Sequence, residues 1–372
     1  MRVLFTGGGT GGHFFPILAV IRELKRLAES EKILDLEIFY MGPDGFGKDI
    51  LSEEGAVFLR VASGKWRRYF SLRNFFDIFK TGFGILRGIW SVFLVMPDVV
   101  FSKGGYGALP AAVGAFIFRI PLVVHDSDAR PGVVSKFSAK FAARIGIAFS
   151  GAAPFFSKER TALVGVPVRK SILGAKREEA RDHLDMFSDF PAVGIFGSSQ
   201  GAEKLNEAVL GVLKELTEEF EVVHQTGTKH LEGVKAEASV ILKDAHGERY
   251  HPFGFLDEFK LRDFYGACDL IVARSSATAI YEIAASGKPS ILVPLSHAAQ
   301  DHQRKNAYEY AGEGAAIILE EPNLTPHILL AEIKKAMSNP EFLKKMSEAA
   351  QKFSRIDSGE VIAREILKLG LH

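Results

Sequence analysis

The sequence predicts an α/β protein of two domains, each built on a doubly wound parallel β-sheet, that face each other across a cleft. Three observations carry this prediction. Short β-rich runs alternate with longer helical stretches, the runs are apolar without polar alternation, and the alternation begins again near the middle of the chain. A chain of 372 residues, of which 47% are apolar and 24% charged, is long enough to bury two hydrophobic cores.

The first domain is predicted to span residues 1–163. It starts with a strand over 3–5, a helix over 16–28 and a strand over 36–40, which is the order of a β-α-β unit. Such short apolar runs are typical of a parallel sheet that helices cover on both faces. Further strands of the same kind are expected at 99–101, 122–124 and 145–148.

The second domain is predicted to span residues 164–340, after a short connector over 164–172 that contains a Gly-Val-Pro turn. Residues 341–372 have the pattern of amphipathic helices, and their return to the first domain is one option. The strands of this domain are expected at 193–196, 221–224, 270–272 and 291–293, with helices between them.

Composition excludes several classes of protein. Cys268 is the only cysteine, so an internal disulfide and a cysteine-based zinc site are excluded, and a reducing compartment fits best. Met1 leads directly into a strand, without the pattern of a signal peptide. The most apolar stretches, 85–96 and 108–124, contain charges and are shorter than the ~20 clean apolar residues of a membrane-spanning helix. We therefore expect no membrane-spanning segment.

Two glycine-rich turns are the first candidate site. Residues 7–12 and residues 197–201 each join a predicted strand to a helix, and such a turn presents backbone N–H groups and the positive end of the helix dipole to an anion such as pyrophosphate. No Gly-Lys-Ser/Thr follows either turn, and neither turn has a convincing acidic residue for a ribose about twenty residues downstream, so a dinucleotide-binding site is not favoured. A glycine turn that only packs helix on strand is the alternative for each.

Two polar clusters follow the later strands of the second domain. Residues 274–282 end on Glu282, a carboxylate placed to accept both hydroxyls of a ribose. Residues 294–306 are rich in amide, hydroxyl and histidine groups of the kind that bind sugars. Ligands of open α/β sheets bind beyond the carboxyl ends of the strands, where both clusters are expected.

The order of six motifs resembles the MurG family. Gly-Gly-Thr-Gly-Gly-His, Gly-Gly-Tyr, His-x-x-x-Ala-x-Pro-Gly, Val-Gly-x-Pro-Val-Arg, Ser-Gln-Gly-Ala and Asp-His-Gln follow one another between residues 3 and 311. Members of this family are inverting transferases that move N-acetylglucosamine from UDP-N-acetylglucosamine to lipid I and so make lipid II for peptidoglycan, cell shape and division. The resemblance implies the GT-B architecture of two Rossmann-like domains, with the donor on the second and the acceptor on the first.

The same resemblance implies a set of donor-binding residues. Leu256 covers the uracil ring with its backbone, Glu282 holds the ribose, Ser199 and Arg169 bind the pyrophosphate, and Gln303 binds the acetylated sugar. The full set is Thr10, Gly11, Gly12, Asp128, Arg169, Ser199, Gln200, Gly201, Leu256, Ala277, Thr278, Glu282 and Gln303.

His13 is the candidate catalytic residue. An inverting transfer needs a base near the attacking hydroxyl, and His13 begins the first helix at the glycine turn. The helix dipole disfavours the charged imidazole, so His13 is expected to act either as the base or by orienting the acceptor. A histidine at a helix start is otherwise often a structural residue.

The segment from His125 to Asp128 departs from the family pattern. Family members usually carry His-Glu-Gln-Asn there, whereas this chain has His-Asp-Ser-Asp, so that Asp128 replaces a neutral amide. Because Asp-x-Asp after an apolar strand holds manganese in another transferase architecture, a metal at Asp126 and Asp128 is an alternative. The leading interpretation needs no cofactor and no metal, since helix dipoles and Arg169 already face the leaving group.

A surface for a membrane is expected in the first domain. Residues up to 163 carry 21 basic and 14 acidic side chains, against 25 and 31 beyond, and residues 60–90 combine seven basic residues with aromatic ones. This composition suits an anionic bilayer, here the inner face of the cytoplasmic membrane, where the undecaprenyl-linked acceptor lies. Nucleic acid is disfavoured, and a core role of the phenylalanines is an alternative. The residues expected at the membrane or acceptor are Trp66, Arg67, Arg68, Phe75, Phe76, Phe79 and Tyr106.

Two other functions remain open from the sequence. One is a related glycosyltransferase that uses the same donor on another lipid-linked or glycolipid acceptor, which the departure at Asp128 suggests. The other is a subunit that binds the sugar nucleotide without turnover. Such a subunit would bind the donor and would tolerate His13→Ala.

Overall fold

The chain forms two compact α/β units in a computed structural model. The structure describes residues 1–43, 47–61, 72–197 and 202–371, with the backbone alone over 72–83 and without the side chain of Ala299. One unit comprises Met1–Val168 and Arg355–His372, and the other comprises Arg169–Ser354. The division falls between residues 168 and 169, where the sequence had placed it after residue 163.

The first unit contains a seven-stranded parallel sheet of order β3-β2-β1-β4-β5-β6-β7. The chain winds outward from β1 to β3 and then restarts at β4 on the other side of β1, so β1 and β4 flank the switch point at which doubly wound folds bind ligands. The strands are β1 (Arg2–Thr6), β2 (Glu37–Gly42), β3 (Val57–Arg60), β4 (Val99–Ser102), β5 (Leu122–Asp126), β6 (Arg144–Ile147) and β7 (Thr161–Leu163).

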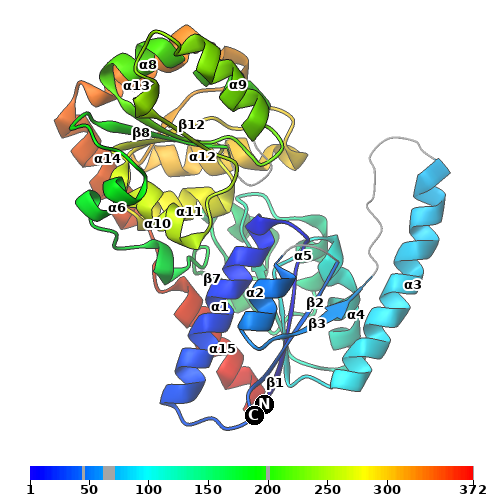
Figure 1. Ribbon diagram of the computed structural model, residues 1–372. Helices are drawn as coiled ribbons and strands as arrows, with labels where there is room; N and C mark the ends of the chain where they lie inside the picture. Colours follow the sequence, from blue (N-terminus) through cyan, green and yellow to red (C-terminus); the bar gives the residue numbers. More distant parts are fainter. Residues whose placement is uncertain (44–46, 62–71, 198–201, 372) are drawn as a thin grey trace. The chain divides into compact units, whose positions relative to one another are not determined.

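Alternate residues of these strands enter two separate cores. Val3 and Phe5 face the core under α1 and α15, whereas Leu4 faces the opposite core under α4. Because both faces are buried, the strands are apolar throughout. Helices α1 and α15 lie side by side, and the two chain ends lie close together in this unit (Figure 1). The helices are α1 (Gly11–Ser30), α2 (Lys48–Glu53), α3 (Leu72–Val95), α4 (Leu109–Phe118), α5 (Val133–Ser138) and α15 (Ser358–Gly370).

The second unit repeats this plan with a six-stranded parallel sheet of order β10-β9-β8-β11-β12-β13. Its switch point lies between β8 and β11. The strands are β8 (Ala192–Phe196), β9 (Glu221–Gln225), β10 (Tyr250–Phe253), β11 (Leu270–Ala273), β12 (Ser290–Leu292) and β13 (Ile317–Ile318). The helices are α6 (Arg177–His183), α7 (Glu203–Leu210), α8 (Leu213–Glu219), α9 (Leu231–Ile241), α10 (Glu258–Ala267), α11 (Ala277–Ala285), α12 (His302–Gly312), α13 (Pro326–Met337) and α14 (Pro340–Phe353).

The predicted fold class is confirmed, with differences at the edges. Each of the nine predicted strands is present, whereas the strands that the sequence did not predict, β3, β7, β10 and β13, are the four outer strands of the two sheets. Helix α1 begins at Gly11, earlier than predicted, and takes Pro16 into its second turn, where the missing N–H leaves one helical hydrogen bond unmade. Of the C-terminal helices, α14 belongs to the second unit and α15 to the first.

Among the described residues, no helix has both the length and the apolar character needed to cross a membrane.

Candidate active site

The first glycine turn joins β1 to α1 at the switch point of the first unit. Thr10 is the N-cap of α1 with an extended backbone, and its carbonyl accepts hydrogen bonds of 3.0 Å from the N–H groups of His13 and Phe14. The first turn of α1 contains no acidic residue, so no carboxylate of that turn competes with an anionic ligand for the positive end of the helix dipole. Thr10, Gly11 and Gly12, which the sequence assigns to the donor, therefore lie at a helix end suited to negative charge.

The Gly-Gly-Tyr motif packs directly against this turn. Gly105, which follows β4, has a φ of 78°, and a Cβ placed on it would lie 3.1 Å from Gly8 Cα. A Cβ on Gly8 would in turn lie 2.8 Å from the imidazole ring of His13. Glycine is required at both positions because a side chain would push the two loops and the histidine apart. Tyr106, expected at the acceptor, follows these glycines and is half exposed.

His13 is oriented by a hydrogen bond to the main chain. Its Nδ1 lies 3.2 Å from the carbonyl oxygen of Lys103. A carbonyl oxygen only accepts, so Nδ1 carries the hydrogen and Nε2 of the neutral ring is the basic nitrogen. The contact fixes both the tautomer and the plane of the ring, which are the two properties that a general base requires.

The segment from His125 to Asp128, which differs from the family pattern, forms a tight polar loop at the end of β5. The buried Asp126 carboxylate accepts hydrogen bonds from the N–H of Asp128 at 3.1 Å and from the N–H of Gly132 at 3.2 Å. Burial and the nearby charge of Asp128 raise the pKa of Asp126. Asp128, which the sequence assigns to the donor, is half-buried in this loop of the first unit. Within the described parts of the chain, no three His, Cys, Asp or Glu side chains are grouped so that they could hold a metal.

The second glycine turn follows β8. A Cβ on Gly197 would lie 2.9 Å from the carbonyl oxygen of Gln225 and 3.3 Å from the nitrogen of Ala202, so glycine is needed where this turn begins. The turn leads into α7, whose N-cap Ala202 makes no side-chain cap hydrogen bond. The residues predicted to bind the donor phosphates, Ser199, Gln200 and Gly201, lie outside the described residues.

Two of the predicted donor residues form a buried ion pair. Arg169 Nη2 donates to Glu282 Oε1 at 2.9 Å, and about 4% of each side chain is exposed. The hydroxyl of Tyr265 donates to the other Glu282 oxygen at 3.4 Å. Burial raises the pKa of Glu282, and the charge of Arg169 and its hydrogen bond oppose that rise. The structure thus joins a residue assigned to the pyrophosphate to one assigned to the ribose.

Glu282 lies on α11, whose start is well defined. Ser276 caps this helix and accepts a hydrogen bond of 3.3 Å from the N–H of Ala279. Ala277 and Thr278 form its first turn, directly after β11. A side-chain cap at this position is typical of a stable helix start. Helix α11 therefore carries three of the predicted donor residues, Ala277, Thr278 and Glu282, on a fixed element.

Gln303 lies in the first turn of α12 and Leu256 in the loop between β10 and α10, at the same edge of the second sheet. The Gln303 side-chain oxygen accepts a hydrogen bond of 3.1 Å from the N–H of Leu295, and its backbone carbonyl accepts one of 2.9 Å from Ser275 Oγ. These contacts join the loops that follow β11 and β12. Leu256 is buried between β10 and α10, so the loop that carries it is fixed by its side chain. The predicted donor residues of this unit that the structure describes thus lie at one edge of its sheet.

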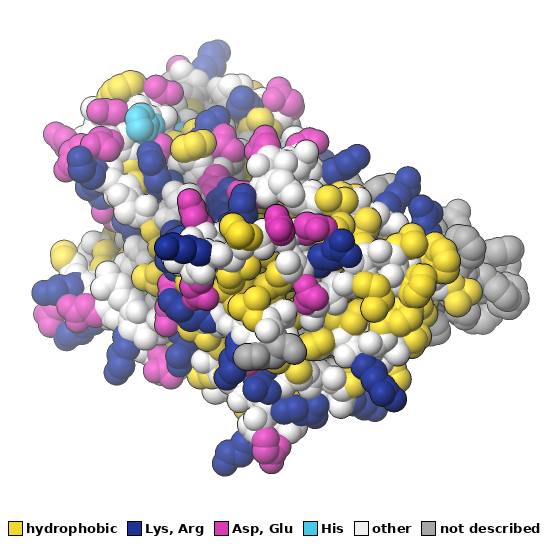
Figure 2. Space-filling view, turned by 90° about the horizontal axis from the view of Figure 1, so that it is seen from below, with side chains coloured by type: hydrophobic (Ala, Val, Ile, Leu, Met, Phe, Trp, Pro, Cys, Tyr) yellow, Lys and Arg dark blue, Asp and Glu magenta, His cyan; other side chains and the backbone are white. Residues whose placement is uncertain are grey.

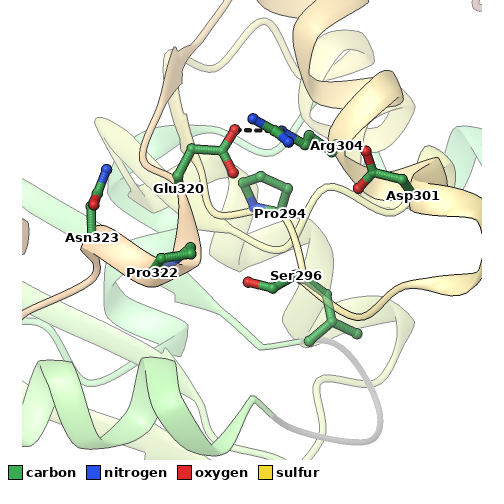
Figure 3. A pocket seen from close by; sticks show the side chains of 8 residues that line it. Pro294, Ser296, Asp301, Arg304, Glu320, Pro322 and Asn323 are labelled. Carbon is green, nitrogen blue, oxygen red and sulfur yellow. Dashed lines mark hydrogen bonds and ion pairs between the residues drawn. The ribbon is translucent and has the colours of Figure 1, made fainter.

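A cavity of about 410 Å³ opens beside Gln303, between the loop after β12 and the segment that follows β13. Figure 3 shows Ser296, Asp301 and Arg304 on one side of it and Glu320 with Asn323 on the other. Arg304 donates to Glu320 Oε1 at 2.8 Å. Pro294, Leu295 and Pro322 complete the lining, so polar and charged groups stand among apolar surface, as in many small-molecule sites.

Sequence reasoning missed Lys103, Tyr265, Arg274 and Glu321. Arg274 donates to Glu321 at 2.6 Å, and both side chains are buried beneath the loop after β12. Arg274 was within a predicted cluster, but nothing in the sequence pointed to its partner 47 residues away. Lys103 stood beside the Gly-Gly-Tyr motif, and a lysine at the end of a buried strand is the signal that could have identified it.

Comparison with known proteins agrees with this architecture. Models of the glycosyltransferase family 28 N-terminal and C-terminal domains match residues 3–147 and 192–359. The solved structure of MurG from Acinetobacter baumannii has a TM-score of 0.74 at 24% identity, covering 99% of both chains. A UDP-GlcNAc 2-epimerase from Neisseria meningitidis, solved with UDP-GlcNAc, has a TM-score of 0.68 at 12% identity, covering 99% of this chain and all of the other. These likenesses show the fold.

Curated relatives extend the similarity to the level of family. UDP-N-acetylglucosamine--N-acetylmuramyl-(pentapeptide) pyrophosphoryl-undecaprenol N-acetylglucosamine transferase of Legionella pneumophila is 32% identical over 366 residues, 98% of this chain and 96% of the relative. A Bacillus cereus protein of the same name, numbered 2, is 32% identical over 98% of this chain and 99% of its own length. With both family 28 domains present and such relatives aligned along its length, the chain belongs to the MurG family of glycosyltransferases.

Proposed function

We propose that the protein transfers N-acetylglucosamine from UDP-N-acetylglucosamine to the muramyl sugar of lipid I, with inversion at the anomeric carbon, and so makes lipid II for the cell wall. The observation that carries this proposal is the family membership over 98% of the chain, because the relatives are named for this transfer. The positions of the motif residues support it, since they lie beyond the carboxyl ends of the strands in each sheet.

His13 is the residue we assign to the acceptor hydroxyl. In an inverting transfer this hydroxyl attacks the anomeric carbon while the bond to UDP breaks, and its proton passes to a base. The bond from Nδ1 to the Lys103 carbonyl leaves Nε2 as the basic nitrogen, and the position at the glycine turn suits a group that meets the acceptor. The negative charge that develops on UDP requires positive groups on the donor side.

Arg169 and Glu282 are the residues we assign to the donor. Each charge is compensated by the other in a site with almost no access to water. Pyrophosphate oxygens would give Arg169 a second anionic partner, and the ribose hydroxyls would donate to Glu282. Both side chains are already oriented by their ion pair before the donor binds, which lowers the entropy cost of ordering them on binding.

We also propose that the protein binds the inner face of the cytoplasmic membrane through the first unit. Figure 2 shows apolar side chains gathered with lysine and arginine on the side of this unit where α3 lies. Arg87, Arg119 and Lys140 are exposed among them. Large exposed apolar patches with basic residues favour an anionic bilayer. This membrane face comprises Leu86, Trp90, Phe93 and Leu94 of α3, Phe116 and Ile117 of α4, and Val133 and Phe137 of α5.

The membrane face is one continuous surface. Helix α4 packs against both α3 and α5, and the ring of Phe93 lies 5.8 Å from that of Phe118. The ring of Phe116 lies 4.9 Å from that of Phe141. Of the residues that the sequence assigns to the membrane, Trp66, Arg67 and Arg68 lie outside the described residues, and the side chains of Phe75, Phe76 and Phe79 are not described.

The experiment that tests the function is transfer of labelled N-acetylglucosamine to a short-chain lipid I analogue. We expect transfer by the wild-type protein, unchanged by EDTA. His13→Ala should lower kcat roughly 100-fold or more, as loss of a general base does. His13→Asn keeps an N–H donor for the Lys103 carbonyl without a base, and His246→Ala, at an exposed position of the second unit, is the matched control.

The other outcomes separate the alternatives. Full activity of His13→Asn would assign His13 to orientation only. Transfer to another lipid-linked sugar but none to lipid I would contradict the acceptor. Loss of transfer in EDTA would favour the metal at Asp126 and Asp128, and donor binding without any transfer would favour the inactive subunit.

A further inference from the structure

Lys103 is a buried lysine at the carboxyl end of β4. Its side chain is 2% exposed, and its Nζ donates to Ser127 Oγ in the loop after β5. Its backbone N–H donates to the Thr6 carbonyl at 2.8 Å, at the end of β1. Its own carbonyl accepts from His13 Nδ1. One residue therefore joins the first glycine turn, the candidate base and the loop that departs from the family pattern.

The charges around Lys103 explain why that departure is tolerated. Asp126 and Asp128 both act on the Lys103 ammonium, and both favour its charged form. Asp126 already accepts hydrogen bonds from the N–H groups of Asp128 and Gly132. A second carboxylate in so closed a loop needs a cation, and a buried ammonium needs an anion. The hydrogen bond from Nζ to Ser127 places the ammonium at the residue between the two carboxylates, so one cation serves both Asp126 and Asp128.

We propose that the Lys103 ammonium pairs with the carboxylates of Asp126 and Asp128 on either side of Ser127, and that Lys103 is a positioning residue. Its backbone carbonyl orients His13, and its side chain holds the loop of residues 126–132 in place for the acceptor. The part of this proposal that concerns the acceptor rests on the proposed function, whereas the pairing does not. Ser127 and Asp128 are half-buried, so they connect the buried ammonium to the surface that an acceptor meets.

A packing role alone does not account for a lysine here. Methionine has a similar length and would fill the same space without the cost of burying an ammonium. The ammonium is kept where it reaches Ser127 and faces two carboxylates. A buried charge that is held in this way is a specificity device more often than a source of stability.

The pair also predicts a pH dependence. Burial lowers the pKa of Lys103 to about 8, against the opposing effect of Asp126 and Asp128. Below pH 8 the pair is charged, and as the pH rises through 8 the ammonium is lost and the carboxylates remain uncompensated. His125 stays neutral throughout this range, because burial and Lys103 hold its pKa well below the ordinary value. His13 faces Lys103 through the carbonyl oxygen and is the other group to consider.

The test is a double-mutant cycle of Lys103→Met and Asp128→Asn in the full chain, with thermal unfolding and steady-state transfer as readouts. We expect Lys103→Met to lower kcat/KM for the lipid I analogue roughly 10- to 100-fold, because a small misplacement of reacting groups has effects of this size. The Kd for UDP should stay within about twofold, since the residues assigned to its uracil, ribose and pyrophosphate belong to the second unit. In the double variant, kcat/KM for the lipid I analogue should recover to within about fivefold of the wild-type value.

Lys288→Met is the matched control, because Lys288 is a largely buried lysine of the second unit whose pKa burial also lowers. It should leave kcat/KM for the acceptor within about twofold. In wild type and the control, activity should fall above pH 8, and in the double variant this alkaline limb should be absent.

Two results would overturn the proposal. One is acceptor kinetics of Lys103→Met equal to wild type, and the other is a double variant no more stable and no more active than Lys103→Met. If Lys103→Met is too unstable to purify, the double variant decides alone: a folded and active double variant supports the pair, and an unfolded one contradicts it. Absence of transfer by wild type would instead contradict the proposed function, while the unfolding cycle would still decide the pairing.

Discussion

Arg169 and Glu282 show how far residue types alone can assign a role. Both were expected at the donor, but as separate contacts, and the structure joins them 2.9 Å apart in a buried ion pair. The sequence could identify them because their motifs are ordered along the chain. It could not predict the pairing, because the two residues are 113 positions apart and only the fold brings them together.

We predict that Arg169→Met and Glu282→Gln each destabilise the second unit by about 3 to 5 kcal/mol, because each leaves a buried charged or polar group without its partner. The double variant should lose clearly less than the sum. Unfolding of the three variants in denaturant measures this coupling. If the losses of unfolding free energy in the two single variants added strictly, the interaction between Arg169 and Glu282 would contribute nothing to stability.

The same variants test the assignment to the donor. Glu282→Gln should weaken binding of uridine more than binding of pyrophosphate, and Arg169→Met should do the reverse, because the ribose contacts one residue and the phosphates the other. Isothermal titration with the two ligands separates the effects. Equal losses for both ligands would indicate a general disturbance of the site.

His224 is another buried side chain whose role was not predicted from the sequence. It is fully buried on β9 between Tyr250, whose hydroxyl lies 2.9 Å from Nδ1, and Asn206, whose side-chain oxygen lies 3.0 Å from Nε2. Asn206 belongs to α7, the helix that follows the second glycine turn, so this network fixes the helix on the sheet. Burial lowers the pKa of His224 to about 3.

We predict a loss of stability in acid that depends on His224. Its pKa is lower in the folded than in the unfolded protein, so the unfolded chain binds more protons between pH 3 and 6.5, and stability falls as the pH falls through this range. At pH 5 the loss is about 2 kcal/mol. In His224→Gln, the difference between thermal unfolding at pH 7 and at pH 5 should shrink. An unchanged difference would contradict the prediction.

Secondary-structure elements were predictable where both faces are buried. The nine predicted strands are apolar runs inside the two sheets, whereas the four unpredicted ones are outer strands. Val57 of β3 is 52% exposed and Leu163 of β7 is 40% exposed, so these outer strands lack the cover on both faces that a central strand has. The start of α1 was also missed, because Pro16 is typical of a first helical turn and here lies inside the helix.

The membrane face is formed by residues of α3, α4 and α5, which are separate in the sequence, so no single stretch of sequence could predict it. We predict that Phe116→Ser with Ile117→Ser weakens binding to vesicles containing phosphatidylglycerol by at least about tenfold, because two exposed apolar side chains are removed from the bilayer contact. Sedimentation with vesicles measures the binding. Phe187→Ser is the matched control, because Phe187 is 83% exposed on the second unit.

Binding of the double variant equal to that of wild type would place the membrane contact elsewhere. Binding that rises with salt would contradict an anionic surface as the partner, because screening weakens the attraction of basic residues to anionic lipid.

At the scale of the whole molecule, the chain uses one plan twice. Each unit has a parallel sheet whose switch point lies beside a glycine turn, and the order of the motifs assigned the acceptor to one unit and the donor to the other. The C-terminal segment returns to the first unit, where Arg26 donates to Glu360 at 2.7 Å and Ile366 enters the core beneath α1. The sequence left this return as one option. Helical periodicity shows which face of a helix is apolar but not which domain that face packs against.

The most direct test of the central claim is mass spectrometry of lipid I analogue incubated with the purified protein and UDP-N-acetylglucosamine, with the new linkage determined by NMR. We predict a product heavier by one N-acetylhexosamine and joined by a β-linkage, as inversion of the α-linked donor requires. An unmodified acceptor under conditions in which the protein is folded and binds UDP, or a product with an α-linkage, would contradict it.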